Sequence, residues 1–534
     1  MINFKLQGNK AFQWSQKDKY YFIGYFFDEN NEIFEGEKAI NFLLNFEKTN
    51  SKIKKFNGIY TYIKITANAV IIISDSINYF PLFYLKQNDD WIVSDDWNYL
   101  INIKGKILPN LEAETEFLSI GFVLDNETVD KDILKTRAGE MVSLNNNGTF
   151  ERLADYYFLP EYFLDNNFQE LNDLIVSDLY EAGKRLIKFL DSRTAVIPLS
   201  GGFDSRLIAC ILKKFNYENV ICFTYGLKNK EEKISRKVAQ NLEYKWYFID
   251  YAEIELKTYI DDPQFLEYIK FIGNGYSMPY LQEYFAVKKL VNDNLIPKNS
   301  VLLPGHTGDY IAGSYILKAI KTNIQNDKLD NWLINNYFSF RKNTKKETKQ
   351  LIKRLSKVLN KYPIQNNYSK NYNPYIEDWD IKEKFSKFIF HSSKVFDFFG
   401  YETYFFLWDK KIVDFFRNLP YKFRENKLLY DYVAINEFFI KNNVYFQEKE
   451  MIVSPLDLKI QKFKNKIRDF FPWKYTLKRM AAHDWRYYAV LTSKMEDKME
   501  EKGYKRLKNF RYFNAIICRW YLDFVKYYDQ NIKS

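Results

Sequence analysis

Cysteine and histidine are both scarce in this sequence. The 534 residues include three scattered cysteines, Cys210, Cys222 and Cys518, and three histidines that lie far apart. An odd number of scattered cysteines argues against a disulfide framework. No group of cysteines and histidines has the spacing of a zinc site. Nothing local supports a Ser/His/Asp or Cys/His hydrolase either.

Long apolar runs are also missing. No run approaches the roughly 18 apolar residues that a membrane-spanning helix needs, and the start, 1–5, lacks a basic segment followed by an apolar one. We therefore expect no membrane span and no secretory signal, and the cytoplasm is the simplest compartment. Glycine (19) and proline (13) are few, whereas 46% of residues are hydrophobic and 19% aromatic, a composition typical of globular domains. A chain of this length predicts two or three domains.

The net charge of +11 is modest, because 79 basic residues are balanced by 68 acidic ones. One denser basic stretch, 459–479, mixes lysines and arginines with Phe and Trp. Such a helix could contact RNA, an anionic lipid surface or an acidic substrate, but a solvated helix face is the favoured interpretation. A nucleic acid is not expected as a partner, and the oligomeric state is not readable.

The pattern of apolar residues changes along the chain. Residues 1–160 read as strands, with a hairpin expected from 58–65 and 69–74. From residue 168 helical and strand patterns alternate, which indicates a parallel sheet covered on both faces. From about 330 the sequence reads mainly as helices. We therefore expect one domain over 1–165 and a second over 166–534.

The most informative feature is the sequence Val-Ile-Pro-Leu-Ser-Gly-Gly-Phe-Asp-Ser at 196–205. An apolar run, 194–199, predicts a buried strand, and apolar residues at helical spacing follow from 205. Backbone N–H groups between a strand end and a helix start can hold an anion, and glycines let it approach closely. A carboxylate beside phosphate, here Asp204, implies Mg²⁺ between them. The Gly-Lys-Ser/Thr of the common phosphate loop is absent.

This loop resembles the pyrophosphate loop of the ATP-pyrophosphatase superfamily, whose members cleave ATP between the α and β phosphates. A second glycine-containing loop, Gly305-His306-Thr307-Gly308-Asp309, follows a predicted strand at 301–303. Together with the strand-rich start and the helical end, the order resembles the asparagine synthetase family, including β-lactam synthetases and lasso-peptide macrolactam cyclases. In the strand-rich part, Asn57-Gly58-Ile59-Tyr60 and Asp75 resemble the family's glutamine amidotransferase domain.

The resemblance implies a fold and a set of site residues. The fold is an α/β synthetase domain of the adenine nucleotide α-hydrolase type with a helical extension, preceded by an α+β, Ntn-hydrolase-like domain. The cofactors are ATP and Mg²⁺, with Asp204 and Asp309 as metal ligands and Lys427 and His306 as catalytic residues. The implied nucleotide-binding residues are Leu199, Ser200, Gly201, Gly202, Asp204, Ser205, Phe223, Tyr225, Gly226 and Gly305.

Three positions depart from the family pattern. Glutamine-hydrolysing members need Cys at position 2 as the nucleophile, and this chain has Ile2. His306 stands where the family has glutamate, and an imidazole can accept a proton near neutral pH. Arg206 stands where serine is usual, so that it either adds positive charge near phosphate or pairs on the helix surface.

These features predict an ATP-dependent amide-forming ligase without its own glutaminase. A small-molecule or peptide carboxylate would be adenylated and then transferred to ammonia or an amine, which could belong to the same substrate. Two alternatives stay open. One is an inactive nucleotide-binding scaffold or sensor, motivated by Ile2 and His306. The other is RNA modification, although Cys210 and Cys222 fall at positions expected to be buried rather than reactive.

Overall fold

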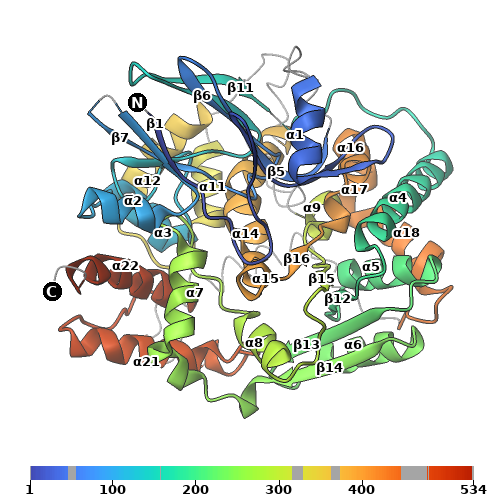
Figure 1. The fold of residues 1–534 in the computed structure, drawn as a ribbon. Helices are drawn as coiled ribbons and strands as arrows, with labels where there is room; N and C mark the ends of the chain where they lie inside the picture. The colour runs from blue at the N-terminus through green and yellow to red at the C-terminus, as the bar shows by residue number, and fades with distance from the viewer. Residues whose placement is uncertain are drawn as a thin grey trace.

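A computed structural model describes residues 2–45, 56–88, 90–156, 158–314, 329–361, 373–446, 478 and 480–531. Its first part contains two β-sheets (Figure 1). One follows the order β11-β10-β6-β5-β3-β2 with β4 also paired to β3, and the other is β1-β8-β7-β9. The strands are β1 (Ile2–Lys5), β2 (Ser15–Lys17), β3 (Tyr20–Phe27), β4 (Ile33–Glu35), β5 (Asn57–Ile65), β6 (Ala69–Ser74), β7 (Phe83–Gln87), β8 (Asp90–Ser94), β9 (Ile133–Lys135), β10 (Glu140–Asn145) and β11 (Phe150–Asp155).

The two sheets pack face to face and helices cover their outer faces, which gives four layers. Ile63 and Ile72 of the larger sheet pack against Tyr84 and Val93 of the smaller one. The opposite faces are covered by helices: α1 (Gly36–Asn45) covers the larger sheet, while α2 (Trp97–Lys104) and α3 (Leu111–Ile120) cover the smaller. Because successive strand residues point to opposite faces, strands rich in apolar residues at every position can fill both interfaces. The predicted hairpin is present, since β5 and β6 pair antiparallel.

The second part is built around a parallel sheet of five strands, in the order β14-β13-β12-β15-β16. The strands are β12 (Ala195–Pro198), β13 (Val220–Gly226), β14 (Lys245–Asp250), β15 (Val301–Leu302) and β16 (Glu402–Thr403). The chain adds strands on one side of β12 and then returns to its other side. The order therefore reverses between β12 and β15, which is the place where open α/β sheets bind ligands.

Helices cover both faces of this sheet, as the sequence predicted. Ala195 and Ile197 of β12 face α5 (Phe203–Lys214) and α6 (Lys230–Asn241), whereas Val196 faces the other core. The helix α4 (Phe168–Leu190) leads into β12 and begins with a capping box formed by Asn167 and Glu170. A domain boundary near residue 165, which we propose from the sequence, would lie between β11 and α4.

The rest of the described chain is mainly helical. The C-terminal helix α22 (Asn514–Asn531) packs against α3 and α7 (Figure 1). No helix within the described ranges is long and apolar enough to cross a membrane. The basic stretch 459–479 lies outside these ranges except for Lys478. The remaining helices include α7 (Pro263–Gly273), α8 (Tyr284–Asn292), α9 (Gly308–Ile311), α11 (Leu329–Tyr337), α12 (Lys345–Leu359), α13 (Asn373–Trp379), α15 (Lys394–Phe399), α16 (Lys410–Asn418), α18 (Leu428–Val433) and α21 (Tyr488–Glu501).

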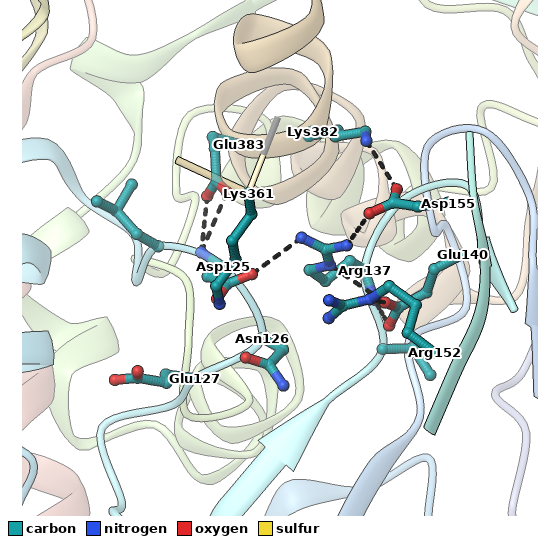
Figure 2. A network of polar contacts seen from close by, with 12 residues as sticks. Asp125, Asn126, Glu127, Arg137, Glu140, Arg152, Asp155, Lys361, Lys382 and Glu383 are labelled. Atoms are coloured by element: carbon teal, nitrogen blue, oxygen red, sulfur yellow. Dashed lines mark hydrogen bonds and ion pairs between the residues drawn. The ribbon is translucent and has the colours of Figure 1, made fainter. Parts of the chain in front are cut away.

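A buried network of charges joins the two parts of the chain (Figure 2). Arg137 lies at its centre and pairs with Asp125 at 3.1 Å, with Glu140 at 3.1 Å and with Asp155. From the helical part, Lys382 reaches Asp155 at 2.8 Å. Because the members are almost fully buried, each charge depends on its partners for solvation.

Asp125 shows how strongly the network is coupled. Burial alone would raise the pKa of Asp125, but the positive charges of Arg137 and Lys361 hold it well below its ordinary value. The backbone N–H of Asp125 also donates to Glu383 at 3.1 Å. The network thus attaches the loops of the four-layer part to the helices that follow α12.

We expect Arg137→Met to destabilise the protein by roughly 3–5 kcal/mol, because three buried carboxylates lose their common partner. Chemical denaturation measures the loss. Arg152→Met is the matched control: among the described residues Arg152 forms an ion pair with Glu140 alone, and its side chain is 26% exposed, so its removal should cost about 1 kcal/mol. Equal effects of the two variants would contradict this role of Arg137.

Candidate active site

The predicted phosphate loop lies between the end of β12 and the start of α5. Gly202 is the N-cap of α5 and makes no side-chain capping bond, so the N–H groups of the first turn have no capping side chain. Ser205 Oγ accepts a hydrogen bond from the backbone N–H of Ser200 at 3.1 Å, and Ser200 Oγ accepts one from Gly202 at 3.1 Å. The two hydroxyls, 3.3 Å apart, fold the loop into a turn suited to an anion.

Arg206 supports this loop from behind. Its Nη2 donates to the carbonyl of Gly201 at 2.7 Å and its Nη1 to the carbonyl of Val444 at 3.0 Å. The guanidinium is fully buried and lies over the rings of Phe203 and Phe439. Neither sequence interpretation of Arg206 describes this arrangement, because the side chain is turned into the core and fixes the direction of a loop carbonyl.

The second glycine loop packs directly on the first. A Cβ atom on Gly305 would lie 2.8 Å from the backbone nitrogen of Ser205, and one on Gly308 would lie 2.0 Å from the carboxyl carbon of Asp204. Only glycine permits both approaches. Between them, Thr307 adopts a left-handed conformation with φ of 81°. The two loops are therefore held in contact at the reversal point of the sheet.

This contact brings Asp204, Asp309 and Lys427 together. The backbone N–H of Asp309 favours the charged form of the Asp204 carboxylate, and Lys427 Nζ pairs with Asp309 Oδ1 at 2.9 Å. Burial raises the pKa of Asp204 to about 7, with a further rise from the charge of Asp309. Burial alone would lower the pKa of Lys427, but the ion pair with Asp309 raises it above its ordinary value. Two acidic groups and one basic group thus share one small region.

Two further features belong to this region: backbone strain at Asn426 and Lys427, and the hydroxyl group of Tyr430. Asn426 and Lys427 both have positive φ, at 51° and 60°, just before α18. Non-glycine residues adopt this conformation rarely, so the surrounding structure must hold Lys427 in place. From α18, the Tyr430 hydroxyl donates to Asp204 Oδ1 at 2.7 Å. No motif pointed to Tyr430, which belongs to the helix α18 that begins after the two strained residues.

The donor set fits Mg²⁺. This ion binds proteins through one or two carboxylates and completes its octahedron with water and substrate phosphates. Asp204 and Asp309 supply two carboxylates beside a loop suited to phosphate. No group of three or more His, Cys, Asp or Glu side chains with metal-ligand geometry occurs in the part of the chain that the structure describes. Two carboxylates beside a loop of this kind suit an ion whose remaining ligands would be phosphates and water.

His306 is placed differently from expectation. Its Nδ1 lies 3.0 Å from the Ser393 hydroxyl, and its ring stacks near Phe405. Burial lowers the pKa of His306 to about 4, so the ring is neutral at pH 7 and a weak proton acceptor. The expectation that it accepts a proton near neutral pH does not fit this environment. A neutral imidazole here is suited to orienting a neighbouring group.

A cleft of about 350 Å³ extends from the phosphate loop along the carboxyl ends of the strands. Of the predicted nucleotide-binding residues, Leu199, Ser200, Gly202, Asp204, Ser205, Phe223, Tyr225 and Gly305 line it, together with His306. Gly201 and Gly226 pack against two residues that line the cleft, Glu231 and Trp485 respectively. The lining residues that the sequence did not indicate are Glu231, Tyr280, Gln282, Glu283, Phe388, Ile389, Ser392, Ser393, Phe396 and Trp485.

These residues come from segments without a recognisable motif. Gln282 and Glu283 precede α8, Ser392 and Ser393 precede α15, and Trp485 precedes α21. In the sequence, the only indication that these segments could line a site was the polar pair Gln282 and Glu283 directly before an apolar helical pattern.

Comparison with protein families gives one match. Residues 190–429 match the model of the asparagine synthase family. This stretch forms an asparagine synthase domain. The matched range contains both glycine loops and Lys427, and it supports an ATP-dependent ligase of the asparagine synthase type. No curated protein sequence matches the chain significantly.

Several solved structures are similar over part of the chain. An NH3-dependent NAD synthetase from Campylobacter jejuni has 16% identity and a TM-score of 0.20, covering 36% of this chain and 95% of its own. A U34-tRNA thiolase from Methanococcus maripaludis has 13% identity and a TM-score of 0.19, covering 42% and 77%. An NMN synthetase from Francisella tularensis has 14% identity and a TM-score of 0.19, covering 44% and 97%.

We expect Gly308→Ala to lower ligase activity at least 100-fold while the protein stays folded. The added methyl group would overlap the Asp204 carboxylate, and a displacement of about 1 Å at a reacting site costs on the order of 100-fold in rate. Steady-state kinetics measures the loss, and circular dichroism confirms the fold. Unchanged activity would show that the packing of the two loops does not position Asp204.

Proposed function

We propose that the protein is an ATP-dependent amide-forming ligase. It adenylates a substrate carboxylate, releases pyrophosphate and transfers the acyl group to ammonia or an amine. The observation that carries the proposal is the convergence of Asp204, Asp309 and Lys427 beside the loop that ends β12. Structural aspartates in unrelated turns would have no reason to lie within electrostatic reach of each other and of the same lysine.

The first step joins the substrate to the nucleotide. A carboxylate oxygen attacks the α-phosphorus of ATP, the bond from that phosphorus to the bridging oxygen breaks, and pyrophosphate leaves. The hydroxyls and N–H groups of the 200–205 loop would hold the departing pyrophosphate. Bound Mg²⁺ would neutralise phosphate charge between Asp204 and Asp309. Lys427 would offset the negative charge that develops on the leaving group.

The second step forms the amide. The nitrogen of ammonia or an amine attacks the acyl carbon, AMP leaves with the electrons of the acyl–oxygen bond, and the nitrogen loses a proton. The wall formed by His306, Ser392 and Ser393 lies on the same cleft. A neutral His306 that is hydrogen-bonded to Ser393 would orient the acyl group there rather than act as an acid or a base.

The nitrogen would not come from glutamine hydrolysed by this chain. Ile2 offers no nucleophile, and its backbone belongs to β1, paired with Trp91 of β8. Asn57, part of the amidotransferase-like motif, donates from Nδ2 to Asp409 at 2.7 Å and accepts from the backbone of Lys410. Asp75 accepts from three backbone N–H groups, the closest that of Ile77 at 2.7 Å. Both polar side chains of the motif therefore hold the fold together.

We expect α-labelled ATP to yield AMP when a suitable carboxylate and ammonium, or an amine-bearing substrate, are present. Lys427→Met should lower this rate on the order of 100-fold, because a preorganised charge at the transition state is lost. Lys441→Met, which removes an exposed lysine paired with Glu437, is the matched control. Tight binding of ATP without AMP from any amine would support the inactive scaffold instead.

We also expect glutamine alone to support no AMP formation and no release of ammonia. Ile2→Cys should not restore glutaminase activity, because Asn57 and Asp75 remain bound to the protein. Ammonia release from glutamine is the direct measurement, with added ammonium as the positive control for the ligase. Ammonia produced by the unmodified chain would overturn the assignment of an external nitrogen source.

A further inference from the structure

A second cavity, of about 140 Å³, lies between the two parts of the chain. Among the described residues it shares no lining residue with the cleft, and neither Asn57 nor Asp75 lines it. Its lining residues are Gln7, Gly8, Asn9, Trp14, Ile23, Phe80, Pro81, Asp95 and Asp96 from the first part, and Phe271, Asn274 and Lys394 from the second. The catalytic steps above use none of them.

Lys394, the first residue of α15, brings to this cavity a positive charge without a hydrogen-bond acceptor. The residue is 8% exposed, and its only ion pair among the described residues is with Asp397, whose Oδ2 lies 3.9 Å from Nζ, beyond hydrogen-bonding distance. Asp397 already accepts from the Tyr79 hydroxyl at 2.9 Å and from Asn9 Nδ2 at 3.2 Å. The ammonium lies 4.6 Å from the ring centre of Tyr79 and 5.3 Å from that of Phe80. These rings attract the charge, but the N–H groups of Lys394 still lack an oxygen to bind.

The charge state of Lys394 favours a negatively charged ligand. Burial lowers the pKa of Lys394, although the charges of Asp397, Asp95 and Asp75 act in the opposite direction. An anionic group bound at Nζ would stabilise the ammonium form and raise this pKa again. The buried ammonium is therefore suited to receive a carboxylate.

Asp95 supplies the opposite charge. Its Oδ2 accepts from the backbone N–H of Gly8 at 2.8 Å and from Trp14 Nε1 at 2.7 Å, and its Oδ1 accepts from the backbone N–H of Gln7 at 3.0 Å. These donors fix the orientation of the carboxylate, and Oδ1 has room for one more donor. The charge of Asp95 acts on Lys394, yet within the described ranges the two side chains, which line one cavity, form no ion pair.

The size and the walls of the cavity restrict the ligand further. Ile23, Phe80, Pro81 and Phe271 give it apolar walls. An engineered protein cavity of roughly 150 Å³ binds benzene, so this one has room for about six non-hydrogen atoms. A purely apolar ligand would leave the Lys394 ammonium without an acceptor, and a simple anion would leave the open position on the Asp95 carboxylate unused. A small molecule with one negative and one positive end uses both.

We propose that this cavity binds a small α-amino acid, such as glycine, alanine or serine, as its zwitterion. The carboxylate of the ligand accepts from Lys394 Nζ, and its ammonium group donates to Asp95 Oδ1. The ligand contacts both parts of the chain and lies beside the cleft without entering it, because Lys394 directly follows Ser393, whose hydroxyl lies 3.0 Å from His306 Nδ1. Binding here requires no ligase activity.

A ligand series on the wild-type protein tests the two charged contacts by titration calorimetry. We expect L-alanine to bind, and propionate, which lacks the ammonium group, and ethylamine, which lacks the carboxylate, to bind at least about 10-fold more weakly. The larger L-glutamine should also bind more weakly than alanine. Propionate binding as tightly as alanine would show an anion site only and overturn the proposal. If glycine, alanine and serine all fail to bind at about 10 mM, the cavity holds water and the proposal is wrong.

Variants then locate the site. Lys394→Met keeps the apolar stem, and Asp95→Asn keeps a carbonyl for Gly8 and Trp14 while an NH₂ group replaces Oδ1. Each should lower the affinity for alanine by roughly 10- to 100-fold. Lys10→Met is the matched control, since Lys10 is exposed, lies over the Phe398 ring and does not line the cavity; it should leave the affinity unchanged. Thermal denaturation verifies that the variants are folded. Unchanged affinity in both cavity variants would place alanine elsewhere and contradict the proposal.

Discussion

The close contact between Gly308 and the Asp204 carboxylate sets the geometry of the whole cleft. It joins two loops that follow separate strands, β12 and β15, and only a residue without a side chain allows the approach. With the loops in contact, the carboxylate is enclosed by Asp309, Tyr430 and Lys427. The position of this carboxylate, and with it the binding of metal and phosphate that we propose, then follows from one steric fact at the reversal point of the sheet.

Much of this arrangement could be predicted because it depends on local sequence. The strand at 195–198, the glycine loop and the helix after it are encoded within about twenty residues, and their order defines the parallel sheet. The convergence of Asp204 and Asp309 follows from strand order, since parallel strands end at the same edge. The four-layer arrangement at the start also follows from strands whose two faces are both apolar.

Other features could not be read from the sequence because they depend on contacts between distant residues. Arg206 looked like a surface or phosphate-binding group, yet it is buried against Val444 and supports the loop from behind. The environment of His306 lowers its basicity, which no motif reports. Trp485 and Glu283 reach the cleft from segments separated from the loop by many elements, so spacing along the chain carries no information about them.

Trp485 lies far along the chain from the two glycine loops, and this has a consequence for how the cleft is encoded. The residues that we propose to bind phosphate lie within 190–429, whereas the ring of Trp485 belongs to a segment beyond that range. A change near the C-terminal end would therefore alter the wall of the cleft while leaving the two glycine loops intact. In such an architecture, the two loops and this part of the cleft wall are encoded in different stretches of the polypeptide.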